Sequence, residues 1–133
     1  MSAPLVNVIQ QDVPAVSTAG NSDDSVIAQA PFAGTVTAVQ YVPEAAITGA
    51  ATNNRTVSLV NKGAAGSGST VVATLTFANG TNATANNEVS LTLSSTAADL
   101  VVAEGDTLQW RSIANGTGLA DPGGVAKVSV SRS

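Results

Sequence analysis

Hydrophobic and polar residues alternate along most of the chain, most clearly in the segment Leu100–Ile113, LVVAEGDTLQWRSI. Leu108 and Trp110 fall on one side of an extended segment there, and the polar residues around them fall on the other. This period of two predicts a half-buried β-strand, entered through a tight turn at residues 104–106. Trp110 has the largest apolar side chain available, so we expect it at the centre of the core with Leu108 beside it. Arg111 should then point to solvent or to a subunit interface.

The same alternation recurs in further segments, separated by turn-forming clusters rich in Gly, Asn and Ser. Inward positions in these segments add three leucines to the predicted core: Leu59, Leu75 and Leu91. Between Ala38 and Val39 the alternation changes phase, which predicts a β-bulge. The predicted strands span 34–42, 56–62, 70–77, 88–93 and 125–131, and the turn clusters span 63–69, 78–87 and 115–124.

This spacing predicts an all-β protein, a single β-sandwich or small β-barrel of jelly-roll-like form. Two short segments, 43–51 and 95–100, are the helical candidates, and Gly49 would weaken the first. Other apolar residues are predicted to face outward. Val60, Val72 and Val125 lie opposite or beside the predicted inward positions, so we expect them at an interface between subunits.

The first 30 residues differ from the rest of the chain. Pro4 and Pro14 oppose a long helix, and the segment AGNSDDS at 19–25 has the composition of a flexible joint. One interpretation is an extended N-terminal arm and linker over residues 1–30, followed by a β-sandwich domain over 31–133. The alternative is that residues 5–9 form an edge strand of the same domain.

Composition narrows the function classes. Apolar residues make up 44% of the 133 residues, and the formal net charge is only −4, so the chain does not have the composition of a disordered protein. The 5 basic residues are scattered and make no patch for a nucleic acid. No stretch is apolar enough to span a membrane, and the N-terminus lacks the pattern of a signal peptide, so we expect synthesis in the cytoplasm.

Candidate chemistry is sparse. The chain has neither His nor Cys, which removes the commonest general base and the thiol nucleophile. Glu104 and Asp106 are best explained as turn residues, and neither Asp23-Asp24 nor Asp99–Asp106 has the spacing of a calcium loop. We therefore expect no enzymatic activity, no cofactor and no metal. Four Asn-x-Ser/Thr patterns are attributed to the abundance of these residues: Asn54, Asn79, Asn82 and Asn115.

Four segments together resemble a known family: residues 30–63, 69–77, 97–110 and 116–130. They include APFAGTVTAVQYVPEAAITGAATNNRTVSLVNKG and AADLVVAEGDTLQW. This pattern resembles the capsid decoration or head-fibre proteins of tailed bacteriophages of actinobacteria.

The resemblance implies a virion structural protein that decorates and reinforces the capsid exterior by binding the major capsid protein. It also implies a homo-oligomer, most simply a trimer, located on the capsid surface after synthesis in the host cytoplasm. An N-terminal arm would touch the capsid through four apolar residues: Leu5, Val6, Val8 and Ile9. A tail-associated or carbohydrate-binding adhesion module is the alternative, which an exposed Trp110 or Tyr41 beside Asp and Asn side chains would favour.

Overall fold

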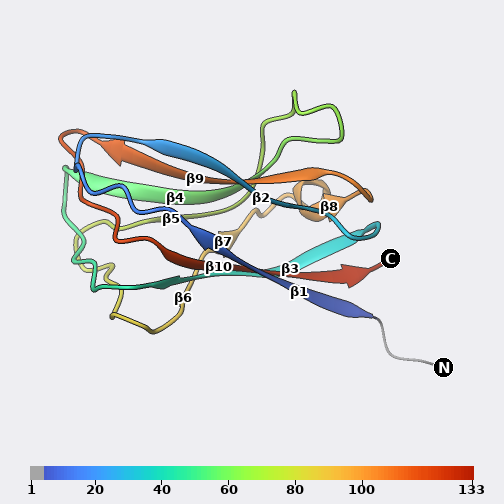
Figure 1. Ribbon diagram of the computed structural model, residues 1–133, viewed down its shortest axis with the longest axis horizontal. Coiled ribbons are helices and arrows are strands. Elements are labelled where there is room, and N and C mark those ends of the chain that lie inside the picture. The colour runs from blue at the N-terminus through green and yellow to red at the C-terminus, as the bar shows by residue number, and fades with distance from the viewer. Residues whose placement is uncertain (1–4) are drawn as a thin grey trace.

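The computed structural model describes residues 5–133 and shows a two-layer β-sandwich (Figure 1). One five-stranded sheet, called sheet 1, has the order β1-β10-β3-β6, and β8 also pairs with β3. The other, called sheet 2, has the order β2-β9-β4-β5-β7. Every pairing between these strands is antiparallel. The strands are β1 (Val6–Val13), β2 (Asp23–Gln29), β3 (Gly34–Pro43), β4 (Asn54–Asn61), β5 (Thr70–Thr76), β6 (Val89–Ser90), β7 (Thr92–Leu93), β8 (Val101–Val102), β9 (Thr107–Asn115) and β10 (Gly124–Arg132).

The all-β sandwich predicted from the alternation is confirmed, with one short helical element among the described residues. Residues 97–100 form a 3₁₀ helix, η1 (Ala97–Leu100), inside the second helical candidate. The first candidate, 43–51, is not helical: Ile47 bridges to Ala83, and Gly49 lies directly against the backbone of Ala78. None of the helical structure within residues 5–133 is long and apolar enough to cross a membrane.

The strand that contains Trp110 has the alternation that its sequence predicts. In β9, Leu108 and Trp110 are buried, whereas Ile113 is exposed. The turn before it depends on Gly105, whose φ of +85° lies in the left-handed region that glycine adopts without strain. Trp110 packs against Tyr41 of the opposite sheet, with ring centroids 5.5 Å apart and planes inclined by 52°. The indole therefore joins the two layers at the centre of the core.

The core combines inward positions of both sheets. Of the predicted core residues, Leu59, Leu91, Leu108 and Trp110 are buried, and Leu75 is partly buried at the margin of the cluster. The indole Nε1 of Trp110 is buried and has no hydrogen-bond partner among the described residues. Its place in the core is therefore due to apolar packing.

β-Bulges in β3 and β5 shift the faces of these strands. In β3, Ala38 pairs with Ser129 but Val36 pairs with Val130, which leaves Thr37 as the extra residue. The sequence predicts a bulge in this strand between Ala38 and Val39, and the structure places it just before, at Thr37, where it keeps both Val36 and Val39 buried.

The second bulge was not expected and overturns part of the predicted subunit interface. In β5, Ala73 pairs with Leu59 and Val71 pairs with Val60, so Val72 is the extra residue and its side chain joins the core. Val60, which lies between Gln109 and Val71 of the neighbouring strands, is also fully buried. Val60 and Val72 cannot form an interface between subunits, and Val125 is partly buried.

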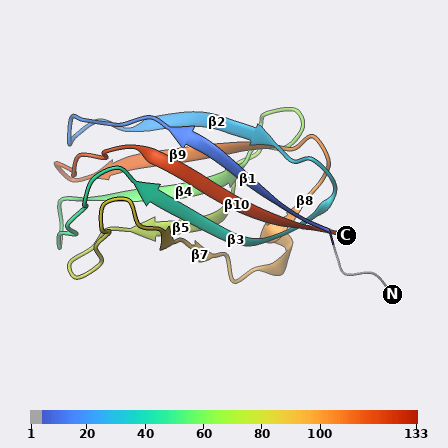
Figure 2. The same cartoon turned by 60° about the horizontal axis from the view of Figure 1, so that its bottom comes forward.

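The predicted arm and its separation from a domain at residue 31 are also wrong for the described residues. Residues 6–13 form the edge strand β1, paired with β10 from Val6 opposite Ser131 to Val13 opposite Gly124. Figure 2 shows β1 running beside β10, with the C-terminus close to the start of β1. Residues 23–29 form β2, the edge strand of sheet 2. The physical reason is alternation: Ile9 and Val13 point inward toward the core, as an edge strand requires.

We predict that replacing Trp110 with alanine lowers the free energy of unfolding by about 3–5 kcal/mol, because it leaves a cavity between the sheets. Trp110→Phe is the matched control. It keeps an aromatic ring against Tyr41 and removes the unpaired N–H, so its loss should be much smaller. Urea unfolding of the three proteins measures both losses, and equal losses for the two variants would contradict this account of the core.

Candidate binding surface

The free edge of β1 is the most prominent unpaired backbone in the sandwich. β1 is the terminal strand of sheet 1, and within residues 5–133 nothing pairs with its outer side. It pairs with β10 without a register shift and contains neither proline nor lysine, and its single charge, Asp12, lies near its end. Such a regular edge can accept another strand through its backbone groups.

Apolar side chains accompany the free edge at the start of β1. Leu5 and Val6 are each 52% exposed, and Val8 is 46% exposed. Ile9, the fourth residue of the predicted capsid contact, instead packs against the core and belongs to the fold. The structure thus exposes three of the four predicted contact residues at the start of this edge: Val6 and Val8 lie in β1, and Leu5 directly precedes it.

β2, the neighbouring edge strand of sheet 2, is protected where β1 is not. Its pairing with β9 shifts register between Val26 and Ala28, which is a bulge at Ile27. Asp24 is exposed on this edge strand and forms an ion pair with Arg111 at 3.1 Å. Bulges and charges are the usual means by which proteins prevent strand addition at an edge. Of the two long edges on this side of the sandwich, β1 is therefore the one that is open to a partner strand.

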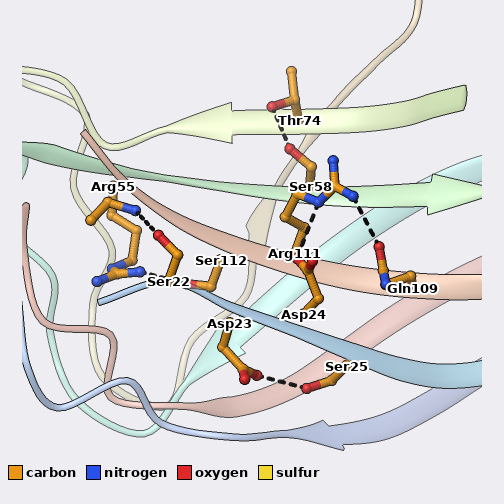
Figure 3. Close-up of polar contacts among 11 residues, drawn as sticks. Ser22, Asp23, Asp24, Ser25, Arg55, Ser58, Thr74, Gln109, Arg111 and Ser112 are labelled. Atoms are coloured by element: carbon orange, nitrogen blue, oxygen red, sulfur yellow. Dashed lines mark hydrogen bonds and ion pairs between the residues drawn. The ribbon is translucent and has the colours of Figure 1, made fainter. Parts of the chain in front are cut away.

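The outer face of sheet 2 is largely polar, and the charges of its ion pair cancel. Ser58 bonds to Thr74 at 2.9 Å and Thr56 to Thr76 at 2.7 Å, which makes hydroxyl pairs between β4 and β5. Figure 3 shows the Arg111 guanidinium in the same row, bonded to Asp24 and Gln109. Three exposed apolar side chains flank these polar pairs: Val26, Val71 and Ile113.

A cluster of four buried polar side chains, here called the buried polar cluster, closes one end of the sandwich. It consists of Arg55 on β4, Ser112 on β9, Tyr41 on β3 and Asp121 in the loop before β10. The Ser112 hydroxyl donates to the Asp121 carboxylate at 2.6 Å and accepts from the Arg55 guanidinium at 3.0 Å. Asp121 also accepts from the Tyr41 hydroxyl and from the Gly123 N–H. The cluster is formally neutral, with one buried cation and one buried carboxylate bridged by a hydroxyl.

Arg55 fastens the segment between β1 and β2 to the domain. Its guanidinium donates to the carbonyl oxygens of Ala19 at 3.1 Å and Asn21 at 2.8 Å, and to that of Leu119 at 2.6 Å. Val16 also exchanges two backbone hydrogen bonds with Asp121. The predicted flexible joint at 19–25 is therefore anchored, which the composition of that segment did not indicate.

Burial sets the ionisation of the cluster. Loss of solvent lowers the pKa of Arg55 from its ordinary value, while the nearby charge of Asp121 acts in the opposite direction. Loss of solvent raises the pKa of Tyr41 far above its ordinary value, and the charge of Asp121 raises it further. The arginine remains a cation because the ordinary pKa of a guanidinium lies far above neutral pH, and the raised pKa of Tyr41 keeps its hydroxyl a neutral donor. The sequence signal for this cluster was slight: Arg55 directly precedes the predicted strand 56–62 and has the same parity as the inward residues Val57 and Leu59.

Most of the carboxylates considered as chemical candidates have structural partners. Asp106 accepts from the Ala103 N–H at 2.9 Å and from Asn61 at 3.0 Å, which fixes the turn before β9. Asp99 accepts from Ser94 at 2.6 Å beside a shallow hollow of about 480 Å³ between β5, β7 and η1. Among the residues that the structure describes, no three His, Cys, Asp or Glu side chains gather closely enough to hold a metal ion.

We predict that Tyr41 does not ionise while the protein is folded. Because its pKa is higher in the folded than in the unfolded state, its contribution to stability is complete below about pH 10 and is lost above that value. The loss should approach about 1.4 kcal/mol per pH unit. Tyr41 is the single tyrosine, so phenolate absorbance reports it alone.

In an alkaline titration this absorbance should rise together with loss of the β-sheet circular dichroism signal. Tyr41→Phe, which has no ionisable ring, is the control and should lose less stability between neutral and alkaline pH. A phenolate signal that rises while the sheets stay intact would contradict the assignment.

No family model matches the chain, and no curated protein matches it. A solved structure from Desmodium yellow mottle tymovirus aligns with 99% of this chain and 90% of its own, at 13% sequence identity and a TM-score of 0.36. A TM-score this low does not indicate a shared fold.

Proposed function

We propose that the protein is a virion structural protein that decorates and reinforces the exterior of a phage capsid by binding the major capsid protein. The observation that carries the proposal is the open edge of β1, with Leu5, Val6 and Val8 exposed beside unpaired backbone groups. The resemblance to phage decoration proteins supplies the kind of partner. The proposed activity is attachment, without catalysis.

Strand addition suits such attachment physically. A strand of the capsid protein that pairs with β1 gains backbone hydrogen bonds whatever its sequence, and a hydrophobic pocket beside it would cover Val6 and Val8. Full burial of each valine contributes about 1.5–3 kcal/mol before ordering costs are subtracted. Many copies on one shell would then hold it through repeated modest contacts.

The carbohydrate-binding alternative gains no support from the aromatic residues. Sugar sites usually present exposed rings, but Trp110 and Tyr41 are 2% and 0% exposed. The two phenylalanines, Phe32 and Phe77, are buried as well. No described observation favours the adhesion module.

The proposed homotrimer needs a different interface from the one predicted. Val60 and Val72 are buried within the chain, so the candidates become Val26, Val71 and Ile113 on the outer face of sheet 2. That face holds an ion pair whose charges cancel, so copies of an acidic protein can approach through it with little repulsion. The homotrimer itself stays a prediction.

Electron microscopy of virions tests the location. Particles of the phage that encodes the chain should show density on the outer capsid surface, and particles made without its gene should lack that density. Shells without the protein should also rupture at a lower temperature. Identical capsid surfaces in the two preparations, or density confined to the tail, would refute the proposal.

Charge introduced at the β1 edge should prevent attachment. We expect Val6→Asp with Val8→Asp to weaken co-sedimentation with undecorated capsids by about tenfold or more for each residue, because each change removes apolar burial and places a charge in the contact. Exposed side chains elsewhere provide the control: Val101→Asp with Ala65→Asp places two charges at exposed positions outside both β1 and the proposed subunit interface.

Both double variants should melt close to the wild-type temperature, since all four side chains are outside the core. Wild-type binding by the β1 variant would contradict a role for this edge. So would an equal loss of binding in the control.

A further inference from the structure

The tetrapeptide Ala-Asn-Gly-Thr occurs twice in the chain, at residues 78–81 and at residues 114–117. Asparagine followed by glycine is chemically the most labile asparagine sequence, because glycine has no side chain to shield its backbone nitrogen. That nitrogen can attack the carboxamide carbon of the preceding asparagine. The two copies have the same local chemistry, so any difference in their reactivity has to come from the fold.

The first copy lies at the tip of an open turn. Thr81 N–H donates to the Ala78 carbonyl at 2.9 Å, and Gly80 between them has a φ of +85°. Asn79 and Gly80 are both exposed, and no atom outside the turn lies within 4 Å of the position that a Cβ of Gly80 would occupy. Within residues 5–133 the Asn79 carboxamide has no hydrogen-bond partner. It is therefore free to rotate toward the Gly80 nitrogen.

The second copy is held at the end of the β4–β9 ladder. The Asn115 Nδ2 donates to Asn54 Oδ1 at 2.8 Å and to Thr56 Oγ1 at 2.9 Å. Asn54 is itself buried and donates to the Ala50 carbonyl at 3.1 Å. Attack by the Gly116 nitrogen requires the Asn115 carboxamide to leave both acceptors. The Asn115 Nδ2 atom, which would leave as ammonia, is the atom that donates both hydrogen bonds.

We propose that Asn79 is a site of spontaneous deamidation in the folded protein, and that the fold protects Asn115 in the identical tetrapeptide. The Gly80 nitrogen forms a bond with Asn79 Cγ, the Cγ–Nδ2 bond breaks, and ammonia leaves with the proton of the Gly80 amide. Water then adds to either carbonyl of the five-membered succinimide and opens it to aspartate or isoaspartate. No electrons are transferred, and solvent water is the only co-reactant.

The product changes the turn in two ways. It adds one negative charge to a chain whose formal net charge is −4, and the isoaspartate form adds a carbon to the backbone of residues 78–81. This turn packs closely against Gly49. A Cβ atom at that position would clash with the carbonyl oxygens of Ala78 and Thr81. A protein that stays on a particle without turnover would accumulate the change with age. The inference itself does not depend on the proposed function.

Peptide mapping of the aged protein tests the proposal. Trypsin cleavage after Lys62, Arg111 and Lys127 separates the two sites, with Asn79 in residues 63–111 and Asn115 in residues 112–127. After incubation of the folded protein in mildly alkaline buffer, the first fragment should show the mass of an acid in place of an amide and should become a substrate for an isoaspartate methyltransferase. The second fragment should remain unchanged.

Denaturant and two variants make the comparison decisive. In concentrated urea both fragments should react at similar rates, since their local sequences match. Asn79→Gln should abolish the reaction of the first fragment, although that fragment also contains Asn82, Asn86 and Asn87. Asn115→Gln should leave the reaction of the first fragment unchanged. The proposal is overturned if Asn115 reacts as fast as Asn79 in the folded protein, or if Asn79 survives folded incubation while the urea sample reacts.

Discussion

The charge of Arg55, enclosed at one end of the sandwich, has to be balanced by polar groups from several separate segments. Its guanidinium makes four hydrogen bonds, to the loop after β1, to β9 and to the loop before β10. A buried ion pair adds little net stability compared with apolar packing, but an unpaired buried charge costs about 3–5 kcal/mol. The buried polar cluster therefore admits one arrangement of these loops and disfavours others.

That constraint is what integrates the N-terminal segment with the sandwich. With the loop between β1 and β2 bound to Arg55 and to Asp121, β1 can enter sheet 1 and β2 can enter sheet 2. β1 then ends as an edge strand whose inner side contributes Ile9 and Val13 to the core. Val6 and Val8 stay exposed at the start of β1, with Leu5 directly before the strand, and these residues form the proposed attachment surface.

The two surfaces used in the functional proposal differ in how they can bind. The β1 edge offers directional backbone hydrogen bonds, which accept a strand of almost any sequence. The outer face of sheet 2 offers hydroxyl pairs and isolated valines, which fit only a surface of matching shape. Attachment to a shell and contact between copies therefore need not compete for one surface.

The sequence by itself determined the fold class, most of the strands and the core around Trp110. A period of two follows from strand geometry and does not depend on which strands pair. It did not determine that Val72 would be buried, because a bulge is fixed by the register between β4 and β5. It also left residues 5–9 open between an arm and a strand.

Only the tertiary structure settled that second question, because pairing with β10 and the bonds to Arg55 join residues far apart in the chain. The buried polar cluster could not be predicted from the sequence for the same reason. Its four members come from separate segments, and each is an ordinary polar residue until the fold removes water around it. The two Ala-Asn-Gly-Thr segments show the division most plainly. Their sequence makes both asparagines prone to deamidation. The hydrogen bonds from Asn115 to Asn54 and Thr56 protect that copy and leave Asn79 reactive.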